Sequence, residues 1–290
     1  MQKKLKRIAA DTNIFLKSFI KEQKKTDLIF PMQYGLFPGG KKIRSKVLID
    51  IGSLFNINYK TLIKIGAAIE CIHAYSLIHD DLPCMDNDRF RRGKLSTHIK
   101  YSESTAVLAG NSLLTMAFEI LSDKKLMISD NIKINLIKRL SECSGHTGIA
   151  GGQFLDLSFE NKKISLKKII DMATKKTGRL FSFSCMVPAI IKGKDINIIK
   201  FFEKIGSEIG LLFQIADDLI DYRGKTIKVG KKTRKDQKQG KATLISLLGY
   251  QNTIIYGEKI KSKIINNLKK YGSKSKNISE TLNYILKRNK

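Results

Sequence analysis

The sequence predicts an all-α protein, and three observations support that prediction. Apolar residues recur every three or four positions through most of the 290 residues, which is the spacing of one helix face. No alternating segments joined by hairpin turns compete with this pattern. The chain has four prolines, which leaves long stretches without a helix-breaking residue. We expect a single domain over residues 1–290, built as a helical bundle with functional loops at one end.

The expected helices follow one another with short breaks between them. Residues 1–20 are basic and lack the continuous apolar run of a signal peptide, so they indicate an amphipathic first helix. The later helical patterns cover residues 65–81, 103–121, 133–145, 165–191 and 198–221. Ser102 or Ser104 is the expected N-cap of the helix at 103–121. The breaks are expected at residues 35–42, 83–94, 144–152 and 222–241.

The amino-acid composition indicates the cellular compartment of the protein. Hydrophobic residues make up 42% of the chain, which is enough to bury a core. The four cysteines form no CxxC pair, as is usual for reduced residues of a cytoplasmic protein. No continuous apolar run approaches the roughly 18 residues that a membrane span needs. We therefore expect a cytoplasmic protein without a membrane span.

The net charge of +28, from 54 Lys+Arg against 26 Asp+Glu, suggests a second class of function. A basic helical protein could bind nucleic acid through such a charge. The lysines are, however, spread over the whole chain, and no basic stretch interleaved with aromatic residues appears. We expect no nucleic-acid partner and keep this class as the alternative.

Two acidic clusters stand at the ends of apolar helical patterns. In the first, Asp80 closes a helix, and Pro83 disturbs that helix so that Asp86 can return toward Asp80. In the second, Asp217 and Asp221 lie roughly 40° apart on one helix face, with Gln214 three residues before Asp217. Neighbouring carboxylates repel each other unless a cation lies between them. Mg²⁺ fits, because it binds a few carboxylates together with substrate phosphates.

Basic residues accompany both clusters. The stretch GGKKIR supplies Lys41 and Arg44, and Arg91 and Arg92 follow the first cluster. Arginine binds phosphate through two parallel hydrogen bonds, and lysine acts as a point charge. Lys176 and Thr177 in the stretch KKTG, and Lys231 after the second cluster, extend the set. The combination predicts a site for magnesium and phosphate groups.

The order of these blocks resembles the short-chain trans-prenyltransferases, and most closely the bacterial farnesyl diphosphate synthases. The resemblance covers nearly the whole chain and rests on the blocks GGKKIR (39–44), DDLPCMD with RRG (80–86 and 91–93), GGQFLDL (151–157), KTGRLF (176–181), FQIADDLID (213–221) and the GK…D…GK loop (230–241). Three positions depart from the family pattern: Ser45 stands where proline is usual, Asn87 where aspartate is common, and Arg234 where glycine is usual.

The resemblance implies the isoprenoid synthase fold, a homodimer and three Mg²⁺ ions. It implies the condensation of isopentenyl diphosphate with dimethylallyl diphosphate and then with geranyl diphosphate, through an allylic carbocation. The implied metal ligands are Asp80, Asp86 and Asp217, with Asp81, Asp218 and Asp221 in support. A terpene cyclase would lack the GGKKIR block.

The resemblance also assigns substrate contacts. Those to the allylic diphosphate would be Arg91, Lys176 and Lys231. Lys241, in the same loop as Lys231, is a further expected substrate contact. Those to isopentenyl diphosphate would be Lys41, Arg44, His73 and Arg92. Thr177 and Gln214, beside Lys176, would stabilise the carbocation with oxygen dipoles. Arg91 and Arg92 are expected to face phosphates and not the aspartates, and His79, His98 and His146 are expected to be structural.

Product length is expected to depend on Tyr75 and Ser76. They precede Asp80 by five and four residues, about one helical turn deeper in the pocket. A bulky ring there would stop the growing chain at fifteen carbons. Synthases of geranyl or geranylgeranyl diphosphate remain the alternatives of the same fold.

Overall fold

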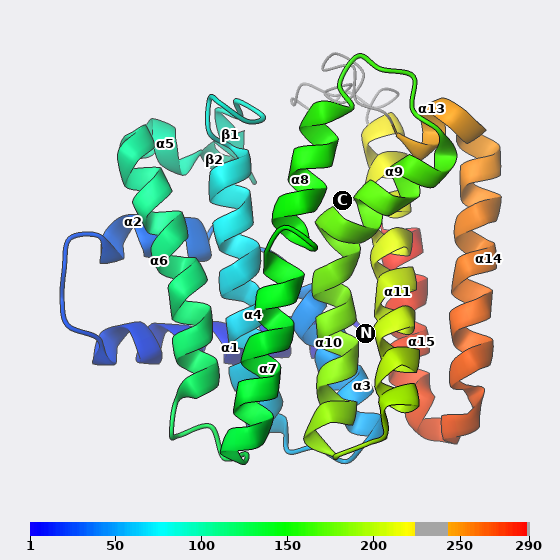
Figure 1. The fold of residues 1–290 in the computed structure, drawn as a ribbon, viewed down its shortest axis with the longest axis horizontal. Coiled ribbons are helices and arrows are strands. Elements are labelled where there is room, and N and C mark those ends of the chain that lie inside the picture. Colours follow the sequence, from blue (N-terminus) through cyan, green and yellow to red (C-terminus); the bar gives the residue numbers. More distant parts are fainter. Residues whose placement is uncertain (224–242, 289–290) are drawn as a thin grey trace. The chain divides into compact units, whose positions relative to one another are not determined.

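The computed structural model describes residues 1–223 and 243–288 (Figure 1). Almost all of these residues that have regular structure are helical, so the predicted all-α class is confirmed. They divide into two compact units, Met1–Arg139 with Ile190–Lys192 and Leu140–Ala189 with Gly193–Lys290. The single domain expected over residues 1–290 stays a prediction, and each unit is described by itself.

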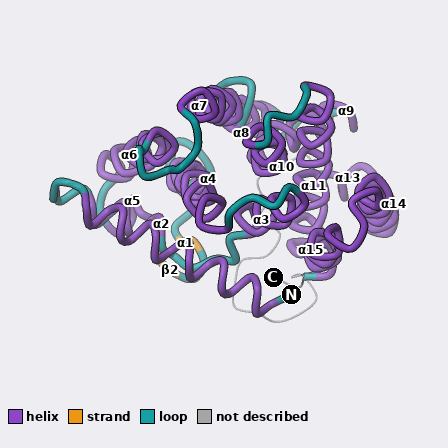
Figure 2. Tube along the Cα trace, turned by 90° about the horizontal axis from the view of Figure 1, so that it is seen from below, coloured by secondary structure: helices purple, strands orange, loops and turns teal. Residues whose placement is uncertain are grey.

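In the first unit, other helices pack around one central helix. The elements are α1 (Gln2–Glu22), α2 (Ile29–Leu36), α3 (Ile43–Leu54), α4 (Tyr59–Asp80), β1 (Phe90–Arg91), β2 (Lys94–Leu95), α5 (Thr97–Lys100), α6 (Glu103–Ser122) and most of α7 (Asp130–Ser144). Helix α4 contacts α1, α2, α3 and α6, and it lies beside α6 in both views (Figures 1 and 2). Its middle, from Ile65 to Ile72, is buried on every side, as expected of a helix that is apolar all round.

The second unit is organised around a long helix, α11. The elements are α8 (Ile149–Ser158), α9 (Leu166–Ala173), the π-helix η1 (Thr174–Gly178), α10 (Arg179–Ile191), α11 (Ile196–Arg223), α13 (Leu244–Leu248), α14 (Tyr250–Leu268), the 3-10 helix η2 (Lys269–Ser275) and α15 (Lys276–Lys287). Helix α11 contacts α14, α15 and η1, and η1 also contacts α8. One side of η1 therefore meets α8 and another meets α11.

The helix ends follow local sequence signals. The Ser102 side chain accepts a hydrogen bond from Thr105 N and is the N-cap of α6, as predicted. Asn58 caps α4 in the same way through Lys60 N and Thr61 N. Helix α4 ends at Asp80, three residues before Pro83, because the chain before a proline disfavours the helical conformation.

Two details differ from the sequence prediction. Strands β1 and β2 form a small antiparallel hairpin that was not expected, since two-residue strands are too short to show an alternating pattern. Residues 149–152, predicted to belong to a break, are the first turn of α8. Added Cβ atoms on Gly151 and Gly152 would overlap backbone atoms of His146 and Lys176. These two glycines allow close packing and do not break the helix.

Two of the described helices are long and apolar enough to cross a membrane. They are α4 and α6, each with an 18-residue window of mean hydropathy 1.3. Core helices meet the same criterion, and 67% of the window in α4 and 44% of that in α6 is buried within the protein. This is weak evidence for a span, and the expected absence of one stays a prediction.

Candidate functional site

The first acidic cluster lies on a loop that folds back onto the end of α4. Asp86 N donates a hydrogen bond to Asp80 O at 2.9 Å, and Asp88 N donates to Asp81 O at 3.1 Å. Asn87, at a position where φ is +48°, also donates to Leu82 O at 3.0 Å. The return of Asp86 toward Asp80 that the sequence predicts is therefore present in the backbone.

Arg91 binds carboxylates of this same loop. Its Nε lies 3.0 and 3.2 Å from the two carboxylate oxygens of Asp81, its Nη2 contacts Asp81 as well, and Asp88 lies 3.4 Å from Nη2. Desolvation lowers the pKa of Arg91, but the bonds and charges of Asp81 and Asp88 outweigh it, so the pKa is raised. The expectation that Arg91 does not face the aspartates is wrong, because its guanidinium binds the buried carboxylate of Asp81. Phosphate binding by Arg91 stays a prediction.

Arg92 reaches a glycine pair before α3. Its guanidinium donates to the carbonyl of Gly39, and a Cβ on Gly40 would overlap that guanidinium. Gly39 and Gly40 have φ of +88° and +140°, which side-chain-bearing residues rarely adopt. The flexible pair thus allows Arg92 to approach the backbone closely.

His73 on α4 lies among cations. Desolvation lowers the pKa of His73 well below its usual value, and the charges of Arg44, Arg92, Lys42 and Arg91 lower it further. The ring is therefore neutral near pH 7 and can donate or accept a hydrogen bond. The structure brings together Arg44, His73 and Arg92, three of the residues expected at isopentenyl diphosphate. Lys41 precedes them on the loop before α3 and is partly exposed.

A buried carboxylate faces this basic set, and the sequence did not single it out. Glu70 Oε2 lies 3.7 Å from Lys42 Nζ, and both side chains are almost fully buried. Ser45 Oγ donates to Glu70 at 2.9 Å, and Ser45 N lies 3.4 Å from the same oxygen. Ser45, which stands where the family pattern has proline, thus donates a hydrogen bond to Glu70. The sequence signal that could have identified it is its position on the same helix, one turn before His73.

In the second unit, Lys176 and Thr177 lie on the π-helix η1, and π-helical turns are frequent at functional sites. Lys176 Nζ lies 2.6 Å from the Asp156 carboxylate on α8. Thr177 Oγ1 donates to Gln214 Oε1 at 3.0 Å, and Gln214 Nε2 donates to Asp218 at 2.9 Å. Asp156 was missed as a partner of Lys176, although it lies in the block GGQFLDL.

Asp217 and Asp218 point to different partners. Asp218 is buried and accepts hydrogen bonds from Gln214 and, at 3.3 Å, from Leu244 N. Asp217 is half exposed and binds Arg288 at 2.6 Å. Asp221 follows Asp217 by four residues on α11 and is partly buried. Lys231, Lys241 and Arg234 lie outside the described residues.

Tyr75 contacts a histidine on its own helix. The rings of Tyr75 and His79 meet edge to face with centroids 5.3 Å apart, and His79 Nε2 lies 3.1 Å from Val107 O. Desolvation, with the charge of Asp80, raises the pKa of Tyr75. Ser76 Oγ donates to His73 O at 3.0 Å, so its hydroxyl is engaged with its own helix.

The donor chemistry of the first cluster fits Mg²⁺. No group of three or more His, Cys, Asp or Glu side chains that could hold a metal gathers among residues 1–223 and 243–288. Mg²⁺ commonly uses one or two carboxylates and takes its other oxygens from water and phosphate. Asp80 and Asp86, joined by their backbone hydrogen bond, meet that requirement. The half-exposed Asp217 already accepts one cation, the Arg288 guanidinium.

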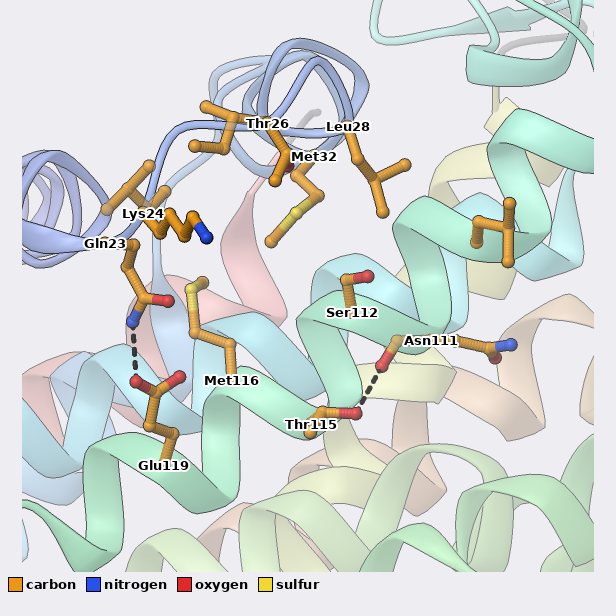
Figure 3. A pocket seen from close by; sticks show the side chains of 13 residues that line it. Gln23, Lys24, Thr26, Leu28, Met32, Asn111, Ser112, Thr115, Met116 and Glu119 are labelled. Carbon is orange, nitrogen blue, oxygen red and sulfur yellow. Dashed lines mark hydrogen bonds between the residues drawn. The ribbon is translucent and has the colours of Figure 1, made fainter.

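A cavity of about 380 Å³ in the first unit lies apart from these residues. Figure 3 shows it beneath the segment between α1 and α2, with Met32 and Met116 facing it and Gln23 bound to Glu119. None of the residues predicted to bind metal or diphosphate lines it. We assign no function to this cavity.

Comparison with known proteins gives concordant matches. Residues 26–285 match the family model described as polyprenyl synthetase. The chain is 39% identical over 270 residues to the farnesyl diphosphate synthase of Escherichia coli (strain K12), covering 91% of this chain and 90% of that protein. The apo crystal structure of an FPP/GFPP synthase from Zymomonas mobilis is 34% identical with a TM-score of 0.87, and the match covers 97% of each chain.

A second solved structure contains ligands. It is a geranyltransferase from Helicobacter pylori, complexed with magnesium and isoprenyl diphosphate. It is 31% identical to this chain with a TM-score of 0.78, and the match covers 97% of this chain and 96% of that one.

Proposed function

The chain belongs to the polyprenyl synthetase family, and from this membership we propose that it is a (2E,6E)-farnesyl diphosphate synthase. Such an enzyme joins isopentenyl diphosphate to dimethylallyl diphosphate and then to geranyl diphosphate. The observation that carries the proposal is the similarity to the E. coli farnesyl diphosphate synthase over nine tenths of both proteins.

The basic set of the first unit supports a diphosphate-binding role. Arg44, Arg92 and the neutral ring of His73 offer donors, with Lys41 beside them, and the proposal assigns them to isopentenyl diphosphate. Glu70 offsets part of the positive charge through Lys42. The cluster can therefore keep its cations close together before an anion arrives.

The second unit supports the binding of the allylic substrate. The proposal assigns its diphosphate to Arg91, Lys176 and Lys231. Lys241 is a further proposed substrate contact, and Lys231 and Lys241 lie outside the described residues. The hydrogen bond from Thr177, the residue after Lys176, to Gln214 on α11 fixes two oxygen dipoles. Fixed dipoles stabilise a developing cation because they need not reorient when the charge forms.

Magnesium is the proposed cofactor, and the ligands would be Asp80, Asp86 and Asp217. Asp81 and Asp221 would support them, and Asp81 also accepts hydrogen bonds from Arg91. When bound, Mg²⁺ would neutralise the charge of the departing diphosphate. Binding of magnesium and an isoprenyl diphosphate by the related H. pylori protein supports this assignment. We propose three ions, as the resemblance implies.

We also propose that the protein is a cytoplasmic homodimer. The support is the resemblance to bacterial farnesyl diphosphate synthases, together with four widely spaced cysteines that form no CxxC pair. Size-exclusion chromatography with light scattering measures the mass directly. A monomer mass near 32.8 kDa would contradict the dimer.

Incubation with isopentenyl and dimethylallyl diphosphates and Mg²⁺ tests the proposed function. We expect products to end at fifteen carbons by chromatography after dephosphorylation. Products of ten or twenty carbons would favour a geranyl or geranylgeranyl diphosphate synthase. No condensation with either dimethylallyl or geranyl diphosphate would contradict prenyl transfer altogether.

A further inference from the structure

The π-helix η1 is held on two sides by backbone contacts and by polar side chains. A Cβ on Gly152 of α8 would overlap the backbone of Lys176 and lie 2.7 Å from the carbonyl carbon of Lys175. A Cβ on Gly210 of α11 would overlap Gly178 Cα and lie 3.0 Å from Gly178 N. Backbone therefore meets backbone on both sides, which leaves η1 little freedom to shift.

The polar side chains of η1 also contact α8 on one side and α11 on the other. Thr177 is tied to α11 through Gln214, and Gln214 is tied in turn to the buried carboxylate of Asp218. Lys176, the preceding residue, is tied to α8 through Asp156. Two consecutive side chains are thus each fixed by a different helix.

The contact between Lys176 and Asp156 is buried on its acidic side. The Asp156 side chain is 9% exposed and that of Lys176 is 23% exposed, and their charged atoms lie 2.6 Å apart. A buried carboxylate requires a paired cation, because an uncompensated charge in a low-dielectric interior is strongly destabilising. An ammonium group has three N–H donors, so the bond to Asp156 leaves donors for a phosphate.

We infer that Asp156 is a positioning residue that holds the Lys176 ammonium in place for the diphosphate of the allylic substrate. The inference rests on the proposed function for the identity of that substrate. A free lysine has a long flexible stem, which loses rotamer entropy when the ammonium is fixed. The ion pair with Asp156 fixes it before the substrate binds.

The neighbouring pair of Lys175 and Asp171 is a matched control. Their charged atoms lie 2.7 Å apart, but the Asp171 side chain is 52% exposed and lies on α9 one turn before Lys175. Asp171→Asn removes the same kind of bond from the adjacent lysine. It should leave the kinetics within about twofold of the wild type, because an exposed pair contributes little.

Steady-state kinetics with both substrates give the main test. We expect Asp156→Asn to lower kcat/KM for geranyl diphosphate about 10- to 100-fold, since a displacement of 1 Å can cost that much. The KM for isopentenyl diphosphate should change less than about threefold, as the effect is local to Lys176. In a Lys176→Met background, Asp156→Asn should cause no further loss. A loss within twofold of wild type, or full additivity with Lys176→Met, would overturn the inference.

Two further measurements keep the test decisive. If Asp156→Asn does not fold, as judged by circular dichroism, Asp156→Glu keeps the charge but displaces it by one methylene. It should then show the same selective loss with geranyl diphosphate, and unchanged kinetics would overturn the inference.

Independently of turnover, ¹H–¹⁵N spectra of ¹⁵N-lysine-labelled protein should show a Lys176 ammonium signal that Asp156→Asn removes and Asp171→Asn retains. If the wild type forms no prenyl product, the proposed function fails. Loss of the Lys176 ammonium signal in Asp156→Asn would still support the inference that Asp156 fixes Lys176. Persistence of the signal in Asp156→Asn would contradict it.

Discussion

The guanidinium of Arg288 lies 2.6 Å from the carboxylate of Asp217, although the two residues are 71 positions apart in the chain. Arg288 also stacks on Phe213 at 3.8 Å and donates to Phe213 O at 3.2 Å. Its side chain is 7% exposed, whereas that of Asp217 is 47% exposed. Desolvation lowers the pKa of Arg288, and the charge of Asp217 opposes that effect. The carboxylate proposed as a metal ligand is therefore already paired with a cation.

Replacing Arg288 with Met should lower the Mg²⁺ concentration needed for half-maximal activity. Arg288 competes with the metal for Asp217, and a partly exposed ion pair of roughly 0.5–1 kcal/mol corresponds to about two- to fivefold. Activity measured over a Mg²⁺ titration gives this concentration. Lys287→Met removes the same charge from the adjacent exposed residue and should leave it unchanged. A higher Mg²⁺ requirement in Arg288→Met would show that Arg288 assists binding and does not compete.

Neutralising the proposed metal ligands should slow turnover strongly without unfolding the protein. We expect Asp80→Asn and Asp217→Asn each to lower kcat by at least about 10²- to 10³-fold, the scale of losing one electrostatic contact in an active site. Asp88→Asn is the control, since Arg91 keeps its stronger bonds to Asp81. Rates are measured at saturating Mg²⁺, and circular dichroism verifies folding. Near-normal turnover in either metal-ligand variant would refute the assignment for that residue.

The sequence predicts much of the fold and part of the site because both depend on local spacing. Helix α4 and its end at Asp80 follow from apolar periodicity and Pro83, and the return of Asp86 follows from the same proline. His73 could be placed near the cluster because it lies two helical turns before Asp80.

The long-range ion pairs could not be predicted in the same way. With 54 basic residues in the chain, no local signal indicates which carboxylate Lys176 or Arg288 binds. Their pairing with Asp156 and Asp217 depends on how α8, η1, α11 and α15 pack. The pairing of Arg91 with Asp81 was mispredicted for a related reason: composition places a base near an acid, but only the loop conformation decides whether they touch.

Removing the Tyr75 ring should lengthen the product. The ring is held edge to face against His79, so it has a fixed orientation on α4. Tyr75→Ala opens space below Asp80, and we expect a shift from fifteen- to twenty-carbon products. Tyr75→Phe keeps the ring and should keep the fifteen-carbon product. Chromatography of the dephosphorylated products distinguishes the two, and unchanged chain length in Tyr75→Ala would refute the role of this residue.

Adding a methyl group at Gly210 should destabilise the protein. The new Cβ would overlap Gly178 Cα, and backbone atoms cannot rotate away as a side chain can. Overpacking of this kind costs about 1–3 kcal/mol, measured as the free energy of unfolding in urea. Gly178→Ala is the matched control, since its nearest neighbour would be Ser207 O at 3.5 Å, an ordinary contact. Equal stability of the two variants would mean that α11 and η1 can move apart without cost.

The half-buried ring of His73 should make the wild-type protein less stable at mildly acidic pH. Desolvation and the nearby arginines lower the pKa of His73 in the folded protein, whereas the unfolded chain has the ordinary value of about 6.5. Below that value the unfolded state binds a proton that the folded state does not, so stability falls as the pH falls. Between pH 7.5 and 5.5 the loss in the free energy of unfolding approaches about 1 kcal/mol.

His73→Gln has no ionisable ring at this position, so urea unfolding at the two pH values should show a correspondingly smaller loss of stability. His146→Gln, at an exposed position, should keep the wild-type dependence. An identical pH dependence in wild type and His73→Gln would show that His73 takes up a proton as readily in the folded protein as in the unfolded chain.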